Sequence, residues 1–381
     1  MTIATLAHLA DPALAPRLVV KVGSALLVGA DGEPRRAWLA ALVGELAAAR
    51  ARGQQVIVVS SGAIALGARR LGLAKGGRGS LADAQAAAAV GQIALAGLWA
   101  DLFADHGTTA AQVLLTLDDL EDRRRWLNVT ATLGTLLARG AVPVINENDT
   151  VATEEIRFGD NDRLAARVGQ AAQAHGVLLL SDIDGLYDRD PRDPEAARIP
   201  VVRQVTPEIH AMATGGSSSG LGSGGMTSKL QAAEIAAMAG MALAIIDGRP
   251  ERPIARAFDA ARGTLFLARA QANARLGARK AWLGGRLRMR GFVHIDAGAV
   301  AALAQGASLL AAGVIRVEGQ FVRGDAIAVV GPAGDVLARG LSEYDAGECT
   351  ALAGRHSRDH ADILGYAPRS ALIHRDQLVL V

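Results

Sequence analysis

Two lysines and one aspartate have the residue types and surroundings that phosphoryl transfer requires. Lys21 lies near the end of an apolar segment, Leu18–Val22, and Lys229 follows a glycine-rich run. A buried ammonium group is costly unless it meets an anion, and phosphoryl transfer is catalysed mainly by positioning and charge stabilisation. Asp162 offers a carboxylate that can hold both lysines in place. Taken alone, Lys21 is explained equally well as a strand-end side chain that reaches solvent.

A phosphate-binding loop has to be found outside the common motifs. The sequence contains no G-x-x-x-x-G-K-[ST] motif and lacks the protein-kinase motif set. The segment Ser223–Lys229 supplies glycines for close backbone approach, two hydroxyl groups and an ammonium group. By composition the run Gly215–Gly225 is typical of a flexible linker, but it leads directly into a predicted helix that begins at Met226. This context favours a phosphate cradle over a solvated loop.

Two clusters of short polar side chains lie between these positions. The segments Asn146–Asp149 and Gly159–Asp162 are dense in Asn and Asp. Such clusters most often form turns and helix caps. They also offer acceptors for a substrate ammonium group. A divalent cation would most naturally be shared with nucleotide phosphates, so we expect no metal site built by the protein alone.

Short apolar segments that alternate with helical segments are expected to position these residues. Apolar segments with little alternation of polar residues predict a parallel sheet covered by helices on both faces, and ligands bind beyond the carboxyl ends of such strands. The polar clusters follow these segments, at Lys21–Ser24, Ser60–Gly62, Asn146–Asp149 and Ser181–Asp184. The predicted strands are 18–22, 55–60, 110–115, 142–145, 177–180 and 242–246.

The length of 381 residues and a change of pattern predict two domains. We expect an α/β domain over 17–275, an arginine-rich linker over 276–284, and a small β-rich domain over 285–381. The second domain has predicted strands at 293–295, 315–317, 326–330 and 378–381. Residues 1–16 are expected to form a frayed N-terminal extension. They have no basic segment before their apolar residues, so we expect no secretory signal.

Charge, cysteine content and hydropathy exclude several classes of protein. A formal net charge of +2 gives no global basic field for nucleic acid, and a single cysteine, Cys349, excludes an internal disulfide framework. This cysteine usage favours a cytoplasmic location. Two uncharged runs, Ala84–Ala100 and Ala297–Ile315, are rich in Ala and Gly and contain Gln or Ser, so we expect buried helices and no membrane span.

Six motifs in order across almost the whole chain resemble the glutamate 5-kinases, which belong to the amino-acid kinases. The resemblance implies an amino-acid kinase fold, a mostly parallel sheet sandwiched by helices, followed by a small β-rich domain of the PUA type. It implies ATP-dependent phosphorylation of the side-chain carboxylate of L-glutamate, the first step of proline biosynthesis. The motifs are Val20–Ser24, Val59–Ile64, Pro143–Asp149, Phe158–Asp162, Leu180–Asp182 with Asp184–Tyr187, and Gly222–Lys229.

The resemblance also assigns roles to residues. Lys21 and Lys229 would stabilise the transferring phosphoryl group, and Asp162 would orient them. Glutamate would be bound by Ser61, Asp149 and Asn161. ATP would be bound by Lys21, Ser181, Asp182, Ser223, Gly224, Gly225, Met226, Thr227, Ser228 and Lys229. The γ-carboxylate of glutamate is already ionised at neutral pH, so no general base is required.

Further expectations follow from the same resemblance. Mg²⁺ would arrive with ATP, proline would act as a feedback inhibitor, and the chain would form a homo-oligomer. RNA is a candidate partner of the PUA-type domain. The sequence departs from the family where Ala25 replaces a commoner hydroxyl residue after Gly23 and Ser24, and where Ser60 replaces a commoner threonine.

Two alternatives remain open. An acetylglutamate, aspartate or uridylate kinase would share the fold, but the segment Phe158–Asp162 and the C-terminal domain favour a glutamate kinase. An RNA-binding protein built on a degenerate kinase is the other alternative. Retention of Lys21, Asp162 and Lys229 together argues against it.

Overall fold

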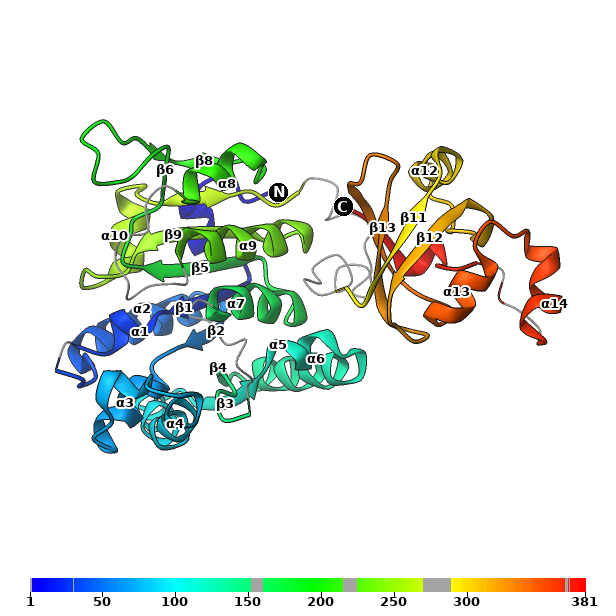
Figure 1. Cartoon of the computed structure of the whole chain (residues 1–381). Helices are drawn as coiled ribbons and strands as arrows, with labels where there is room; N and C mark the ends of the chain where they lie inside the picture. The colour runs from blue at the N-terminus through cyan, green and yellow to red at the C-terminus, as the bar shows by residue number, and fades with distance from the viewer. Residues whose placement is uncertain are drawn as a thin grey trace. The chain divides into compact units, whose positions relative to one another are not determined.

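The computed structural model describes residues 2–29, 31–151, 160–214, 225–269, 289–366, 369 and 371–381. The chain divides into two compact units, Met1–Asn273 and Ala274–Val381, both drawn in Figure 1. The predicted linker 276–284 lies outside the described residues. The boundaries 17–275 and 285–381 therefore stay a prediction.

The first unit is built on an eight-stranded sheet with the order β3-β4-β2-β1-β5-β9-β10-β8. Its neighbouring strands run parallel except β9 and β10, which are antiparallel. The strands are β1 (Arg17–Val22), β2 (Gln55–Ser60), β3 (Ala110–Leu115), β4 (Val142–Glu147), β5 (Gly176–Ser181), β8 (Val201–Val202), β9 (Ala242–Asp247) and β10 (Thr264–Phe266). The predicted α/β class with a mostly parallel sheet is confirmed.

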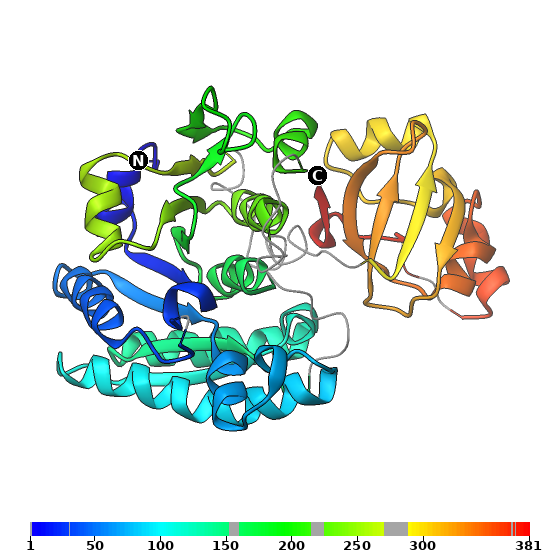
Figure 2. The same ribbon diagram turned by 60° about the vertical axis from the view of Figure 1, so that its left-hand side comes forward.

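Helices cover both faces of this sheet, as Figures 1 and 2 show. Helices α6, α7 and α9 pack on one face, against β4, β1 and β9, whereas α2, α4 and α10 pack on the other. The helices are α1 (Ser24–Leu27), α2 (Arg36–Ala51), α3 (Ala63–Arg70), α4 (Leu81–Ala104), α5 (Leu117–Glu121), α6 (Arg123–Ala138), α7 (Asp160–Ala171), α8 (Pro207–Thr214), α9 (Gly225–Met238) and α10 (Pro253–Asp259).

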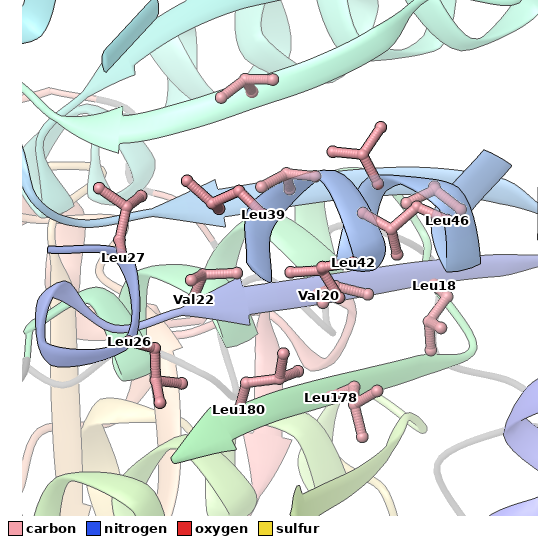
Figure 3. Close-up of a cluster of buried hydrophobic side chains, with 14 of the residues drawn as sticks. Leu18, Val20, Val22, Leu26, Leu27, Leu39, Leu42, Leu46, Leu178 and Leu180 are labelled. Atoms are coloured by element: carbon pink, nitrogen blue, oxygen red, sulfur yellow. The ribbon is translucent and has the colours of Figure 1, made fainter. Parts of the chain in front are cut away.

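Strand β1 decides where Lys21 points. Successive side chains of a strand point to opposite faces. Val20 and Val22 lie in the apolar core with Leu39 and Leu42 of α2, as Figure 3 shows. Lys21 therefore points to the other face, on which α7 packs against β1.

The N-terminal segment differs from the expected frayed extension. A short 3₁₀ helix, η1 (Leu6–Ala10), buries Leu6 and Leu9 in the core of the first unit. Gln54 fixes it by donating hydrogen bonds from Nε2 to the carbonyl oxygens of Leu9 (2.9 Å) and Ala15 (2.8 Å). The physical reason is tertiary burial, since a segment this short has no stability of its own.

Helix α4 is, among the described residues, the one helix long and apolar enough to cross a membrane by length and composition. One face of this helix nevertheless packs in the core of the unit. Leu95, Leu98 and Trp99 pack with α2 and the sheet, and Trp99 Nε1 donates a 2.9 Å hydrogen bond to Ser60 Oγ at the end of β2. The helix expected within Ala84–Ala100 is confirmed, but it is buried along one face only, since Ile93 on the other face is 76% exposed.

The second unit contains a five-stranded sheet with the order β12-β11-β13-β14-β15 and its own apolar core. Its strands are β11 (Gly291–Ile295), β12 (Val314–Gly319), β13 (Ala326–Val330), β14 (Val336–Leu341) and β15 (Leu378–Leu380), and its helices are α12 (Ala297–Ala304), α13 (Ala346–Leu352) and α14 (His360–Leu364). Only β11 and β13 pair in parallel. The predicted small β-rich domain is confirmed.

Two details of this unit differ from the sequence expectations. Strand β14 was not predicted, because Arg339 and Gly340 interrupt its apolar pattern; a side chain at Gly340 would collide with Ile373. The run Ala297–Ile315 does not form one buried helix. Helix α12 ends at Ala304, and Leu303 is the one buried residue of this helix. The small side chains of this run leave little apolar surface to bury.

Two glycines let α3 and α4 touch through their backbones. A Cβ atom at Gly67 would overlap the carbonyl oxygen of Ala87, and one at Gly91 would overlap that of Ala63. Helix α3 follows β2 directly, so this contact holds the end of β2 against α4.

Replacing Gly91 by alanine should therefore destabilise the first unit. We expect a loss of about 1–3 kcal/mol or more, as for other overpacked cores. Gly97→Ala is the matched control, because Gly97 lies on the same helix with nothing within 4 Å of the added Cβ. Alanine there should be neutral or stabilise the helix by up to about 1 kcal/mol. Equal melting temperatures for the two variants would contradict the close packing described here.

Candidate active site

A pocket of about 1480 Å³ opens beyond the carboxyl ends of β1, β2, β4, β5 and β9. This is the edge of the sheet that the sequence predicted for a site. Of the predicted site residues, those that line the pocket are Lys21, Ser61, Asp149, Asn161, Asp162, Ser181, Asp182, Gly225, Met226 and Lys229.

One buried carboxylate holds both predicted lysines. Lys21 Nζ lies 2.7 Å from Asp162 Oδ1, and Lys229 Nζ lies 2.9 Å from Asp162 Oδ2. Asp162 is 1% exposed and Lys21 is 8% exposed. The three residues come from the end of β1, the first turn of α7 and the start of α9. Helices α7 and α9 pack side by side, which brings Asp162 and Lys229 together (Figures 1 and 2).

The electrostatics of this trio favour an anionic ligand. Burial acts to raise the pKa of Asp162, but the two lysines outweigh it and hold that pKa below its ordinary value. Burial also lowers the pKa of Lys21, and Asp162 opposes this effect. One carboxylate cannot neutralise two ammonium groups, so the trio keeps a net positive charge that a phosphate can compensate.

A chain of amide and hydroxyl groups lies beside this trio. Asn161 Nδ2 donates to Ser61 Oγ at 2.5 Å and to Asn146 Oδ1 at 3.2 Å. Asn146 Nδ2 in turn donates to Gln92 Oε1 of α4 at 2.8 Å. Among the described residues, Asn161 Oδ1 is buried without a hydrogen-bond partner. A ligand that donates a hydrogen bond would satisfy this oxygen.

Two carboxyl groups with raised pKa values adjoin the amide chain. Burial raises the pKa of Glu147 to about 7, and the charge of Asp149 acts in the same direction. Burial raises the pKa of Asp149 to about 6, while the positive charge of Arg78 opposes the shift. A cationic ligand group would stabilise the ionised form of both carboxyl groups.

The ends of β5 and β9 carry a second polar cluster. Ser181 Oγ donates to Asp182 Oδ1 at 3.1 Å. Beyond it, Arg262 pairs with Asp184 at 2.6 Å, and Arg249 pairs with Asp247 at 2.8 Å. Sequence reasoning missed both arginines, because each lies in a loop that no motif marks.

The glycine-rich segment is only partly described. Ser223 and Gly224 lie outside the described residues, and α9 begins at Gly225. Gly225, Met226 and Lys229 line the pocket, whereas Thr227 and Ser228 are not among its lining residues. Ser24 and Ala25 line it from the first turn after β1, so the missing hydroxyl of Ala25 falls at the pocket wall.

The comparisons with known proteins agree with this architecture. Residues 16–247 match the model of the amino acid kinase family, and residues 291–364 match the PUA domain. The chain is thus an amino acid kinase that carries a PUA domain.

Its relatives narrow the family further. A protein named glutamate 5-kinase from Novosphingobium aromaticivorans is 79% identical over 381 residues, which cover 100% of both chains. Glutamate 5-kinases from Sphingopyxis alaskensis and Zymomonas mobilis are 60% and 54% identical, over 97% of this chain and 99% and 92% of theirs. The chain belongs to the glutamate 5-kinase family.

The trio of Lys21, Asp162 and Lys229 predicts that loss of either lysine impairs turnover rather than folding. Lys21→Met and Lys229→Met should each lower kcat on the order of 10²-fold, because each removes a charge aimed at the phosphoryl group. The matched control is Lys75→Met, since Lys75 is exposed and does not line the pocket. Near-normal kcat in either site variant, with unchanged thermal melting, would contradict the site.

The raised pKa of Asp149 predicts a pH-dependent KM for the substrate that carries the ammonium group. Below about pH 6 the carboxylate becomes protonated, so this KM should rise about tenfold per pH unit while the KM for the nucleotide stays flat. Asp149→Asn should raise the KM at every pH and remove the rise. Glu147→Gln should keep the rise of KM below about pH 6. If the KM of Asp149→Asn still rose at low pH, a group other than Asp149 would be responsible for the pH dependence.

Proposed function

We propose that this chain transfers the γ-phosphoryl group of ATP to the side-chain carboxylate of L-glutamate, giving L-glutamyl 5-phosphate and ADP. This is the first step of proline biosynthesis. The observation that carries the proposal is that one pocket contains two groups of side chains. Two lysines pair with one buried carboxylate, and a cluster of hydroxyl, amide and carboxyl side chains lies beside them. Membership of the glutamate 5-kinase family supports the choice of substrate.

In the proposed reaction, a γ-carboxylate oxygen of glutamate attacks the γ-phosphorus of ATP. A new O–P bond forms as the bond from that phosphorus to the β,γ-bridging oxygen breaks, and the electron pair leaves with ADP. The attacking carboxylate is already ionised at neutral pH, so no residue has to remove a proton. Lys21 and Lys229 offset the charge on the transferring group, and Asp162 is a positioning residue that holds both ammonium groups.

The amino-acid end of glutamate fits the polar cluster. Asp149 would accept a hydrogen bond from the α-ammonium group. Because burial raises the pKa of Asp149, a positive charge beside it would stabilise its ionised form. Asn161 Oδ1 is a second acceptor, because it is buried without a partner among the described residues. Ser61 lies next to it through the 2.5 Å hydrogen bond from Asn161. Acetylation of the substrate nitrogen would remove the charge that this cluster recognises.

The nucleotide would occupy the other half of the pocket. Ser181, Asp182 and the start of α9, with Gly225, Met226 and Lys229, are the described residues we assign to ATP. Thr227 and Ser228 belong to the same assignment as residues of the first turn of α9, and Ser223 and Gly224 extend it beyond the described residues.

The residues present fit a magnesium ion that is bound with the nucleotide. Among the described residues, no group of three or more His, Cys, Asp or Glu side chains gathers as a metal site. Mg²⁺ prefers to keep water and phosphate ligands and to use one or two carboxylates. Asp182 lines the pocket beside the assigned phosphate groups and could supply one. When bound, the ion neutralises charge on the phosphate oxygens.

Regulation, assembly and location complete the proposal. By family resemblance we infer inhibition by proline at the glutamate half of the pocket, a homo-oligomeric assembly and action as a soluble cytoplasmic enzyme. RNA remains a candidate partner of the second unit.

A substrate panel tests the proposed reaction. ADP release should depend on L-glutamate and be far slower with L-aspartate, N-acetyl-L-glutamate and UMP, each at equal concentration. Trapping the acyl phosphate with hydroxylamine as a hydroxamate should give one equivalent per ADP formed. ADP release with acetylglutamate or UMP and none with glutamate would replace this proposal with a different kinase of the same fold.

A further inference from the structure

The charged side chains of the pocket are divided between its two halves. In the nucleotide half, Lys21 and Lys229 share Asp162, and Arg249 and Arg262 pair with Asp247 and Asp184. The amino-acid half is lined by Ser61, Arg78, Ser80, Gln85, Asn146, Glu147, Asp149 and Asn161. Among these described lining residues, Arg78 is the one Lys or Arg.

Arg78 acts on the acidic side of this half. It lies in the segment between α3 and α4, and its positive charge acts on the carboxyl group of Asp149. The segment is anchored at Gly77, which is buried and has a φ of +75°. A Cβ atom at this position would collide with the Cβ atoms of Ala68 and Ala87, so only glycine lets the segment pack this closely. This anchor joins the segment to α3 and α4 and holds the next residue, Arg78, at the pocket wall.

The substrate places three charged groups in the pocket. Its γ-carboxylate has to meet the phosphoryl group beside Lys21 and Lys229. Its α-ammonium group suits Asp149. Its α-carboxylate then has to lie near Glu147 and Asp149, where an anion is repelled unless a cation compensates it. A guanidinium group can bind a carboxylate through two parallel hydrogen bonds, which an ammonium group cannot.

We propose that Arg78 binds the α-carboxylate of the amino-acid substrate and, with Asp149, selects substrates that carry both a free α-amino and a free α-carboxylate group. The inference rests on the proposed function, since it names how the same pocket recognises the amino-acid end. It assigns a specificity role to a residue that no motif of the sequence marked.

Substrate analogues that lack one group at a time test this role. 4-Aminobutyrate is glutamate without its α-carboxylate, and glutarate is glutamate without its amino group. Initial rates at low concentration give kcat/KM for glutamate and both analogues, in the full-length protein. Arg78→Ala should lower kcat/KM for glutamate on the order of 10²-fold, the loss expected for a charge-assisted pair, and leave that for 4-aminobutyrate unchanged. Arg78→Lys should recover part of the loss.

The control and the second arm separate this role from a structural one. Arg70→Ala removes an exposed arginine at the end of α3 that does not line the pocket, and it should leave every value unchanged. Glutarate keeps both carboxylates, so its kcat/KM should fall in Arg78→Ala as that of glutamate does. A merely structural role would lower all three substrates together.

The outcomes are distinct. Unchanged glutamate kinetics in Arg78→Ala, or an equal loss for glutamate and 4-aminobutyrate, would overturn this inference and leave the proposed function standing. A wild-type protein that releases no ADP with glutamate would overturn the proposed function and the inference with it.

Discussion

The pairing of two ammonium groups with one buried carboxylate is the constraint on which the pocket depends. Asp162 can hold Lys21 at 2.7 Å and Lys229 at 2.9 Å only if the end of β1, the start of α7 and the start of α9 meet at one point. The uncompensated positive charge would oppose folding if it stayed without a counterion. In the proposed reaction a phosphate group of ATP supplies that counterion, so binding of the nucleotide relieves this cost.

The parallel sheet brings the other groups to the same point. Strands β4, β2, β1 and β5 are consecutive in the parallel part of the sheet, and their carboxyl ends share one edge. The hydrogen bonds that run from Gln92 through Asn146 and Asn161 to Ser61 then link α4, β4, α7 and the turn after β2. Asn161 donates to Ser61 and Asn146, and Asn146 donates to Gln92, so residues of three other elements fix the orientation of the Asn161 amide and its buried oxygen.

Much of this arrangement could be predicted from the sequence, and the rest required contacts between distant residues. Strand β2 has the predicted bounds because its branched apolar residues leave no competing period, and Lys21, Asp162 and Lys229 stand in recognisable motifs. The burial of η1 depends on Gln54, 45 residues after Leu9, and the pairing of Arg262 with Asp184 spans 78 residues. Gln92 and Arg78 lie in no motif: the packing of α4 brings Gln92 to Asn146, and the segment between α3 and α4 brings Arg78 to the pocket.

The backbone contact between α3 and α4 has a consequence for the length of the substrate. At Gly67 and Gly91 the two helices meet backbone to backbone, so at these two contacts no side chain can change rotamer and alter the spacing of the wall that the helices form. In the proposed function, the amino-acid end of the substrate is recognised at this wall, and the phosphoryl group lies at Lys21 and Lys229, which Asp162 holds. On that proposal, the fixed separation of the two ends selects for the length of the substrate: a ligand shorter by one methylene group would reach one end or the other, but not both in reactive geometry.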